Sequence, residues 1–205
     1  MNGGVERTEP KGYTVVEGPA ETNGEYLRLE AVMYPPPGPA RESVELPHEP
    51  WGLDNGQEHV HPKQEEWFEV TAGKLRVAYD GTERTLTEGE SVTLPRDVPH
   101  THWNPTREPT RFRWERRPAR RSKQWLETNY VLAQQGRTDE DGVPESLLQL
   151  SVWMNEHPHD TYATIAPVPL LRGVFAVLAP LGRLAGYDAV HTAEELGEGE
   201  QNARP

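Results

Sequence analysis

The sequence contains no cysteine, so neither disulfide bonds nor thiolate ligands can form, and any transition-metal site must use imidazole and carboxylate groups. Only 34% of residues are hydrophobic, while 18 glycines and 20 prolines suit a β domain with many turns better than a helical bundle. Cationic residues are also few. The 21 Lys and Arg against 33 Asp and Glu give a formal net charge of -12, which repels nucleic acid and anionic membranes. We therefore expect no nucleic-acid partner.

An apolar run long enough to cross a membrane is missing as well. The most apolar stretch, residues 168–184, is too short and contains Arg172, Pro180 and Arg183, so we expect it to pack against protein. The first twelve residues are polar and charged and lack the apolar core of a signal peptide. The sequence therefore predicts a cytoplasmic protein without a transmembrane segment.

The order of turn signals and apolar segments predicts one main β domain followed by helices. Between residues 59 and 115, glycine-containing turns at 72–73, 80–81 and 88–89 separate short strands, and no helical stretch lies between them. This pattern indicates an antiparallel sandwich or barrel and excludes a parallel α/β fold. We divide the chain into an N-terminal arm (1–24), a β-barrel (25–117), a helical extension (118–187) and an acidic tail (188–205).

Three helices are predicted in the extension: 122–135, ended by Gly136; 144–155, with Pro144 as its first residue before Glu145; and 168–184. The third helix carries an apolar stripe that is too extensive to face water. The stripe consists of Leu170, Leu171, Val174, Phe175, Leu178 and Leu181. We expect it to be buried on the barrel or across the interface of a homodimer.

Two short segments carry the chemistry. Because strand side chains alternate, His59 and His61 lie on the same face and form a chelating pair. Strand parity places Glu66, rather than Glu65, on the inner face with Phe68 and Val70, so Glu66 is the expected carboxylate ligand.

The second segment begins at Gly89 and brings His100 onto another strand, after Pro95 and Asp97 and before Asn104. Three imidazoles and one carboxylate suit a single divalent transition metal ion such as Fe, Mn, Zn, Ni or Cu. Such a set leaves one net positive charge and one or two coordination positions for water or a small-molecule ligand.

These segments resemble the two motifs of the cupin superfamily, G-x5-HxH-x3,4-E-x6-G and G-x5-PxG-x2-H-x3-N. In the first motif Leu53 replaces the leading glycine, and in the second Asp97 replaces the middle glycine. Aspartate tolerates left-handed turn conformations, so the turn before His100 should be retained. The resemblance implies a jelly-roll (double-stranded β-helix) barrel, metal dependence through His59, His61, Glu66 and His100, and a homodimer. It covers residues 25–116.

Other residues admit a structural and a functional interpretation. His102 shares parity with His100 and is a candidate acid or base, although a structural histidine explains it equally well. His48, His157 and His159 lack a carboxylate at ligand spacing and are interpreted as surface residues.

A basic run and several aromatic residues are interpreted structurally. The run consists of Arg111, Arg113, Arg116, Arg117, Arg120 and Arg121. Because its first members alternate with Phe112 and Trp114, it is interpreted as the wet face of a strand. Core packing is expected for Tyr79, Phe68, Phe112 and Trp51, although they could also line a pocket.

Taken together, these features predict a metal-dependent enzyme of the oxygenase or isomerase class that acts on a small anionic or oxygen-rich substrate. A module that binds or senses a small ligand without turnover is the alternative, because family membership does not name a substrate.

Overall fold

In the part of the chain that the structure describes, ten strands form two antiparallel sheets of five strands each, in the orders β1-β2-β9-β4-β7 and β10-β3-β8-β5-β6. These orders come from a computed structural model that describes residues 12–34, 57–139 and 142–192. The strands are β1 (Tyr13–Glu17), β2 (Leu27–Met33), β3 (His59–Val60), β4 (Glu65–Ala72), β5 (Lys74–Tyr79), β6 (Thr82–Thr87), β7 (Ser91–Leu94), β8 (His100–Trp103), β9 (Thr110–Arg117) and β10 (Tyr162–Ala163). The chain is therefore mainly β, with a jelly-roll barrel as predicted.

Alternation along the strands fills the space between the sheets. In β4, Glu66, Phe68 and Val70 are buried while their neighbours are partly exposed, so the predicted parity is confirmed. In β9, Phe112 and Trp114 are buried by the same alternation. Phe68, Phe112, Trp114 and aliphatic side chains of both sheets form the barrel core, and Tyr79 packs against it.

Two turns show why their residues are needed. Asp97 has φ 63°, the left-handed conformation expected where the family pattern has glycine, and its N–H donates to the His61 carbonyl at 2.8 Å. This bond ties the turn before His100 to His61, directly after β3. At Gly73 (φ 85°), a Cβ would lie 3.1 Å from the Pro109 carbonyl oxygen and 3.2 Å from Thr110 Cα, so glycine also allows a close approach.

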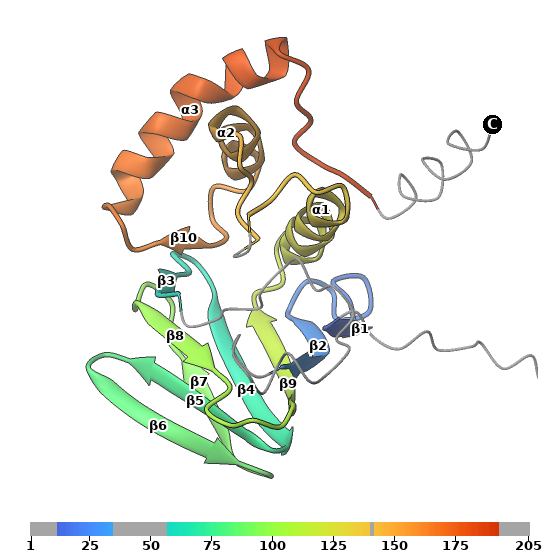
Figure 1. Cartoon of the computed structure of the whole chain (residues 1–205), viewed down its shortest axis with the longest axis vertical. Helices are drawn as coiled ribbons and strands as arrows, with labels where there is room; N and C mark the ends of the chain where they lie inside the picture. Colours follow the sequence, from blue (N-terminus) through green and yellow to red (C-terminus); the bar gives the residue numbers. More distant parts are fainter. Residues whose placement is uncertain (1–11, 35–56, 140–141, 193–205) are drawn as a thin grey trace, which may run out of the picture.

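The extension consists of α1 (Ser122–Gln134), α2 (Leu147–Glu156) and α3 (Val168–Leu184). Figure 1 shows the three helices together at one end of the sheets, with β3 and β10 between them and most of the strands. Gly136 (φ 66°) follows α1 as predicted. The start of α2 was predicted too early: Ser146 caps the helix by accepting from the Gln149 N–H, while Pro144 lies in a bridge with Thr138.

The predicted segments do not separate cleanly in space. β1 lies within the proposed arm, yet it pairs with β2, so the sheet begins at Tyr13. β10 lies within the extension and pairs with β3, with Ala163 opposite His59. The barrel and the extension thus share a sheet at the edge nearest the histidines.

Several predictions fall outside the described residues: those for His48, Trp51 and Leu53, and those for residues 1–11 of the arm and 193–205 of the tail. The described part of the tail, residues 188–192, packs against the helices. There the Asp188 carbonyl accepts from Gln149 Nε2 at 2.8 Å, and the His191 N–H donates to Thr128 Oγ1 at 3.1 Å. Among the described residues, no helix combines the length and the apolar character that crossing a membrane requires.

Candidate metal centre

The four predicted ligand residues come together at the end of the barrel nearest the helices. His59 lies on β3, His61 directly after it, Glu66 on β4, and His100 at the start of β8, where it pairs with His59. All four side chains are buried, with at most 5% of any of them exposed. One nitrogen or carboxylate oxygen from each lies within 4.8 Å of the others. This grouping can hold one metal ion.

Hydrogen bonds at the far side of each ring leave the inner nitrogens for coordination. His59 Nδ1 donates to the Gln57 carbonyl at 3.1 Å, and His100 Nδ1 donates to the Val98 carbonyl at 2.8 Å. Because a carbonyl can only accept, Nδ1 carries the proton in both rings and Nε2 presents its lone pair. These are the partners that orient a histidine ligand and fix its tautomer in metal sites.

His61 is held from the extension instead. Its Nδ1 lies 3.2 Å from the Thr161 hydroxyl oxygen, and its Nε2 lies 2.9 Å from Glu66 Oε1. A hydroxyl can donate or accept, so Thr161 accommodates either tautomer of His61. When Nε2 binds a metal, Nδ1–H donates to Thr161 Oγ1.

Burial keeps the histidines neutral. It lowers the pKa of His59 and of His61 from 6.5 to about 4, so both rings are unprotonated at neutral pH and ready to coordinate. Burial acts in the opposite direction on Glu66, yet the positive charges of His61 and Arg116 hold the pKa of this carboxyl well below 4.5. Because His61 is itself neutral above about pH 4, the positive charge beside Glu66 at neutral pH is that of Arg116. With His59 and His61 neutral and Glu66 ionised, the donor set of three imidazoles and one carboxylate fits a divalent transition metal.

Arg116 belongs to the interior, not to a wet face as the basic run suggested. It is 3% exposed, its Nε donates to Glu66 Oε1 at 2.9 Å, and its Nη1 donates to Asp160 Oδ1 at 2.7 Å. The guanidinium lies 4.7 Å from the ring centroid of Trp114 and 5.2 Å from that of Trp125. Arg116 thus fixes the carboxylate ligand and connects it to the extension. Strand alternation could have predicted this burial, because Arg116 has the same parity as Phe112 and Trp114.

A buried polar chain continues from Asp160 into the loop between β3 and β4. Ser122 Oγ donates to Asp160 Oδ2 at 3.3 Å, and Gln64 Nε2 donates to Ser122 Oγ at 2.7 Å. Gln64 Nε2 also donates to the Pro118 carbonyl at 2.8 Å. These bonds join the loop that follows the first two ligands to the start of α1. No sequence pattern indicated this role for Asp160 or Ser122.

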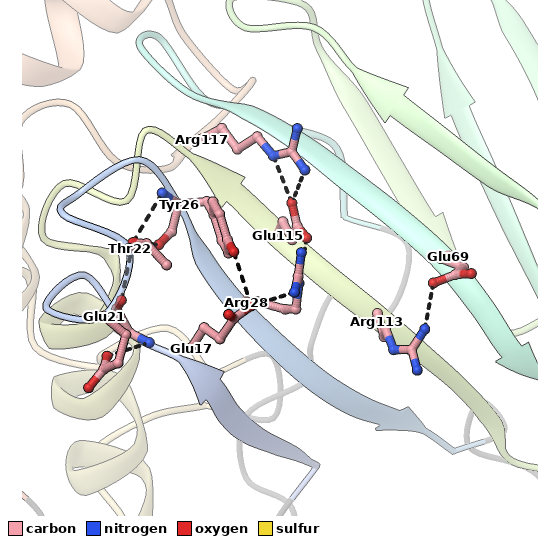
Figure 2. A network of polar contacts seen from close by, with 10 residues as sticks. Glu17, Glu21, Thr22, Tyr26, Arg28, Glu69, Arg113, Glu115 and Arg117 are labelled. Carbon is pink, nitrogen blue, oxygen red and sulfur yellow. Dashed lines mark hydrogen bonds and ion pairs between the residues drawn. The ribbon is translucent and has the colours of Figure 1, made fainter.

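The other arginines of β9 lie on its outer face, which is only partly exposed to solvent. Arg111 and Arg113 are exposed, as predicted, and Arg113 pairs with Glu69 at 2.9 Å. Figure 2 shows Glu115 between Arg28 and Arg117 on the outer face of the sheet. Because these arginines cover it, the Glu115 side chain has no exposed surface although it points outward.

The remaining histidines separate by burial. His102 is 2% exposed and points into the barrel; its ring centroid lies 4.6 Å from that of Phe68 and 6.4 Å from that of His59. It is therefore a neighbour of the centre, and its role as an acid or base stays a prediction. His159 is exposed as expected, but the surface prediction for His157 is wrong. His157 ends α2, and its Nδ1 donates to the Trp153 carbonyl at 3.0 Å.

Residues 50–114 match a family model described as the cupin domain. Similar solved structures include an uncharacterized conserved protein with a double-stranded β-helix domain from Klebsiella pneumoniae, at 17% identity over 52% of this chain and 76% of that chain, with a TM-score of 0.38. A cupin-superfamily sugar phosphate isomerase from Silicibacter pomeroyi is 19% identical over 52% of this chain and 59% of that chain, with a TM-score of 0.37. A Cupin 2 conserved barrel domain protein from Salinispora arenicola is 17% identical over 51% of this chain and 72% of that chain, with a TM-score of 0.36.

No curated protein matches the chain. Nothing about activity follows from structural likenesses of this extent. The family model, in contrast, spans His59, His61, Glu66 and His100 together with the glycines and the asparagine of both motifs. Residues 50–114 are therefore a cupin domain.

Proposed function

We propose that the chain is a metal-dependent enzyme of the oxygenase or isomerase class acting on a small anionic or oxygen-rich molecule. The observation that carries the proposal is the convergence of His59, His61, Glu66 and His100, all buried, with one donor atom of each within 4.8 Å of the others. A divalent ion bound there supplies a Lewis acid that stabilises negative charge developing on a substrate oxygen.

The chain's own residues prepare this site for a single negative charge. A divalent ion and Glu66 together leave one positive charge, and the Arg116–Asp160 pair adds none. The surrounding barrel core excludes water, which strengthens the attraction of an anionic oxygen to the centre. His102, buried beside His59, is the candidate to carry a proton.

Metal content tests the proposal directly. In protein expressed without added metal, elemental analysis should find one divalent transition metal per chain. His61→Ala and Glu66→Ala should each lower occupancy at least about 10-fold, because a ligand is lost. His159→Ala is the matched control, since His159 is exposed and lies outside the cluster.

Unchanged metal content in both ligand variants would overturn the assignment. Turnover is tested separately, by titrating Co(II)- or Fe(II)-loaded protein with carboxylates, keto acids, sugars and polyphenols and measuring oxygen consumption with those that bind. A metal spectrum that no oxygen donor alters would indicate a closed coordination sphere and a structural metal, contrary to the enzyme proposal.

One observation favours the alternative, a module that binds or senses a ligand without turnover. Two residues of the extension contact the centre: Thr161 bonds to the ring of His61, and Asp160 bonds to Arg116. A change in the occupancy of the metal site can therefore alter the packing of the helices through these two contacts. Ligand binding that changes hydrogen exchange in α2 and α3, with no product formed, would support this alternative over catalysis.

We further propose that the protein is a homodimer. The predicted stripe on α3 is divided: Phe175 is buried, whereas Leu170, Val174 and Leu181 are 59%, 40% and 53% exposed. An apolar surface of this kind is typical of a protein interface. Cytoplasmic residence and the absence of a nucleic-acid partner stay predictions from composition.

A further inference from the structure

A cavity of about 350 Å³ lies between the barrel and the extension. On the barrel side it is lined by β3 and β9, through His59, Trp114 and Arg116. The opposite wall comes from the three helices and from residues 161–165, which include β10. Roughly 150 Å³ is enough for benzene in an apolar cavity, so this one has room for a substituted ring.

Several aromatic side chains form part of the wall of this cavity. Trp114, Trp125, Trp153, Tyr162 and Phe175 all line it. Two pairs of these rings are stacked: Trp125 and Trp153 with centroids 4.7 Å apart, and Tyr162 and Phe175 with centroids 6.4 Å apart. Aromatic faces of this kind favour a planar aromatic guest, which can stack on them or meet them edge to face.

Only one end of the cavity approaches the metal centre. Of the four ligand residues, His59 alone lines the cavity, and Arg116 and Thr161 lie beside it there. A molecule in the cavity therefore reaches the centre past His59. Its oxygen-bearing end must point in this direction, because the other walls offer mainly apolar surface.

Charge restricts what that end can be. Arg116 is the only lysine or arginine among the described residues that line the cavity. Its Nε and Nη1 are already bound to Glu66 and Asp160. A phosphate, which carries close to two negative charges, would find no uncompensated cation in the walls. The single positive charge of a loaded centre matches one carboxylate or one phenolate.

We infer that this cavity is the substrate site, and that its ligand is a small aromatic molecule with one ionisable oxygen group, an aromatic monocarboxylate or a phenol. The inference rests on the proposed function because the oxygen group is taken to face the metal centre. It narrows the substrate class, since the mainly apolar walls offer few hydrogen-bond partners for the several hydroxyl groups of a sugar or a sugar phosphate.

Calorimetric titration of the metal-loaded full chain with benzoate and 4-hydroxybenzoate tests the inference, with glucose 6-phosphate as the comparison. We expect the aromatic acids to bind and the sugar phosphate not to. Ala163→Phe should weaken benzoate binding at least about 10-fold by filling the cavity opposite His59. Ala163 is exposed, so the larger side chain should not prevent folding.

Leu171→Trp provides a second filling variant from α3, and Ala176→Phe is the control, since Ala176 is exposed on α3 and does not line the cavity. The control should bind benzoate as the unsubstituted protein does. Failure of both aromatic acids to bind at millimolar concentration, or equal binding by both filling variants and the control, would overturn the inference.

Chelated protein distinguishes this inference from the proposed function. Because the aromatic side chains in the wall do not depend on the metal, benzoate should still bind the metal-free chain, although more weakly, and Ala163→Phe should still weaken that binding. If no metal is found but this pattern holds, the cavity assignment stands and the metal-dependent function falls. If metal is bound and only glucose 6-phosphate binds, the metal-dependent function stands and the assignment of the cavity to an aromatic ligand falls.

Discussion

The ligand residues of the centre could be predicted from the sequence, whereas a residue that forms a hydrogen bond to one of their rings could not. His59, His61, Glu66 and His100 were predicted because their spacing along two short segments determines which strand face they share. Thr161, which bonds to His61, lies 100 positions further along the chain. Its position depends on how the extension folds back, and no local pattern reports that.

Arg116 and His157 illustrate a different limit. Both were assigned to the surface: Arg116 because it belongs to a basic run, and His157 because no carboxylate lies at ligand spacing from it. Both are buried because a specific partner satisfies the polar group: Glu66 and Asp160 for Arg116, and the Trp153 carbonyl for His157. Burial of a charged or polar side chain depends on such partners, which only the tertiary structure supplies.

The neutral histidines give the metal-free protein a defined pH dependence. The folded chain lowers the pKa of His59 and His61 to about 4, whereas the ordinary value is 6.5. Between these values, the unfolded chain binds protons that the folded chain does not, so the free energy of unfolding falls as pH falls. The loss should be roughly 3 kcal/mol per histidine, complete near pH 4.

Urea denaturation of chelated protein at intervals from pH 7 to pH 4 measures this loss. His61→Gln removes one of these titrating rings, so its loss of stability between pH 7 and pH 4 should be smaller by roughly 3 kcal/mol. A stability that stays constant between pH 6.5 and pH 4.5 would show that the two rings are not buried in neutral form.

At the scale of elements, strand and helix positions followed from local signals, and contacts between elements did not. The strand that carries Glu66 and the helix that ends before Gly136 were predicted from alternation and turn chemistry. β10 was not, because a strand of two residues has no detectable period and exists through its pairing with β3. The division of α3 into a buried and an exposed apolar face was also missed, because it depends on which other elements α3 contacts.

The packing of α3 on α2 depends on Gly182. A Cβ at this position would lie 2.5 Å from Val152 Cγ2 and 2.8 Å from the Leu148 carbonyl oxygen, and a backbone atom cannot move aside as a flexible side chain can. Gly182→Ala should therefore push the helices apart and lower the free energy of unfolding by about 1–3 kcal/mol. Thermal and urea denaturation measure the change.

Gly173 offers the matched control on the same helix. It is exposed, and a Cβ there would meet nothing within 4 Å. Gly173→Ala should raise stability by up to about 1 kcal/mol, because alanine has the higher helix propensity. If the two substitutions have the same effect, close approach at Gly182 does not hold α3 on α2.

At the scale of the whole molecule, the extension makes the centre a joint product of two parts of the chain. The barrel supplies all four candidate ligands, while the extension supplies Thr161 and Asp160 and the aromatic wall opposite β9. Val60 of β3 belongs to the same apolar cluster as Trp153 and Phe175 of the helices. Removal of the extension should therefore disturb the centre as well as expose apolar surface.

The outer face of α3 argues for self-association. Its exposed apolar residues are Leu170, Val174, Val177, Leu181 and Leu184. Their alternating spacing of four and three residues is the heptad pattern of a helix that packs lengthwise on another helix. No described element covers this seam, and the seam is apolar along its whole length, so a second α3 related by a two-fold axis would match it.

We therefore expect a dimer by sedimentation equilibrium, and a monomer when Val177→Glu and Leu181→Glu are combined, because two buried carboxylates at each copy of the seam would lack partners. Ala176→Glu is the control: Ala176 is exposed on α3 but lies off the seam, so this variant should remain a dimer. Each variant should keep its metal content, since the seam contains none of the four ligands. A monomeric parent protein that instead sediments with liposomes would assign the seam to a membrane surface, and identical masses for all variants would refute a dimer through α3.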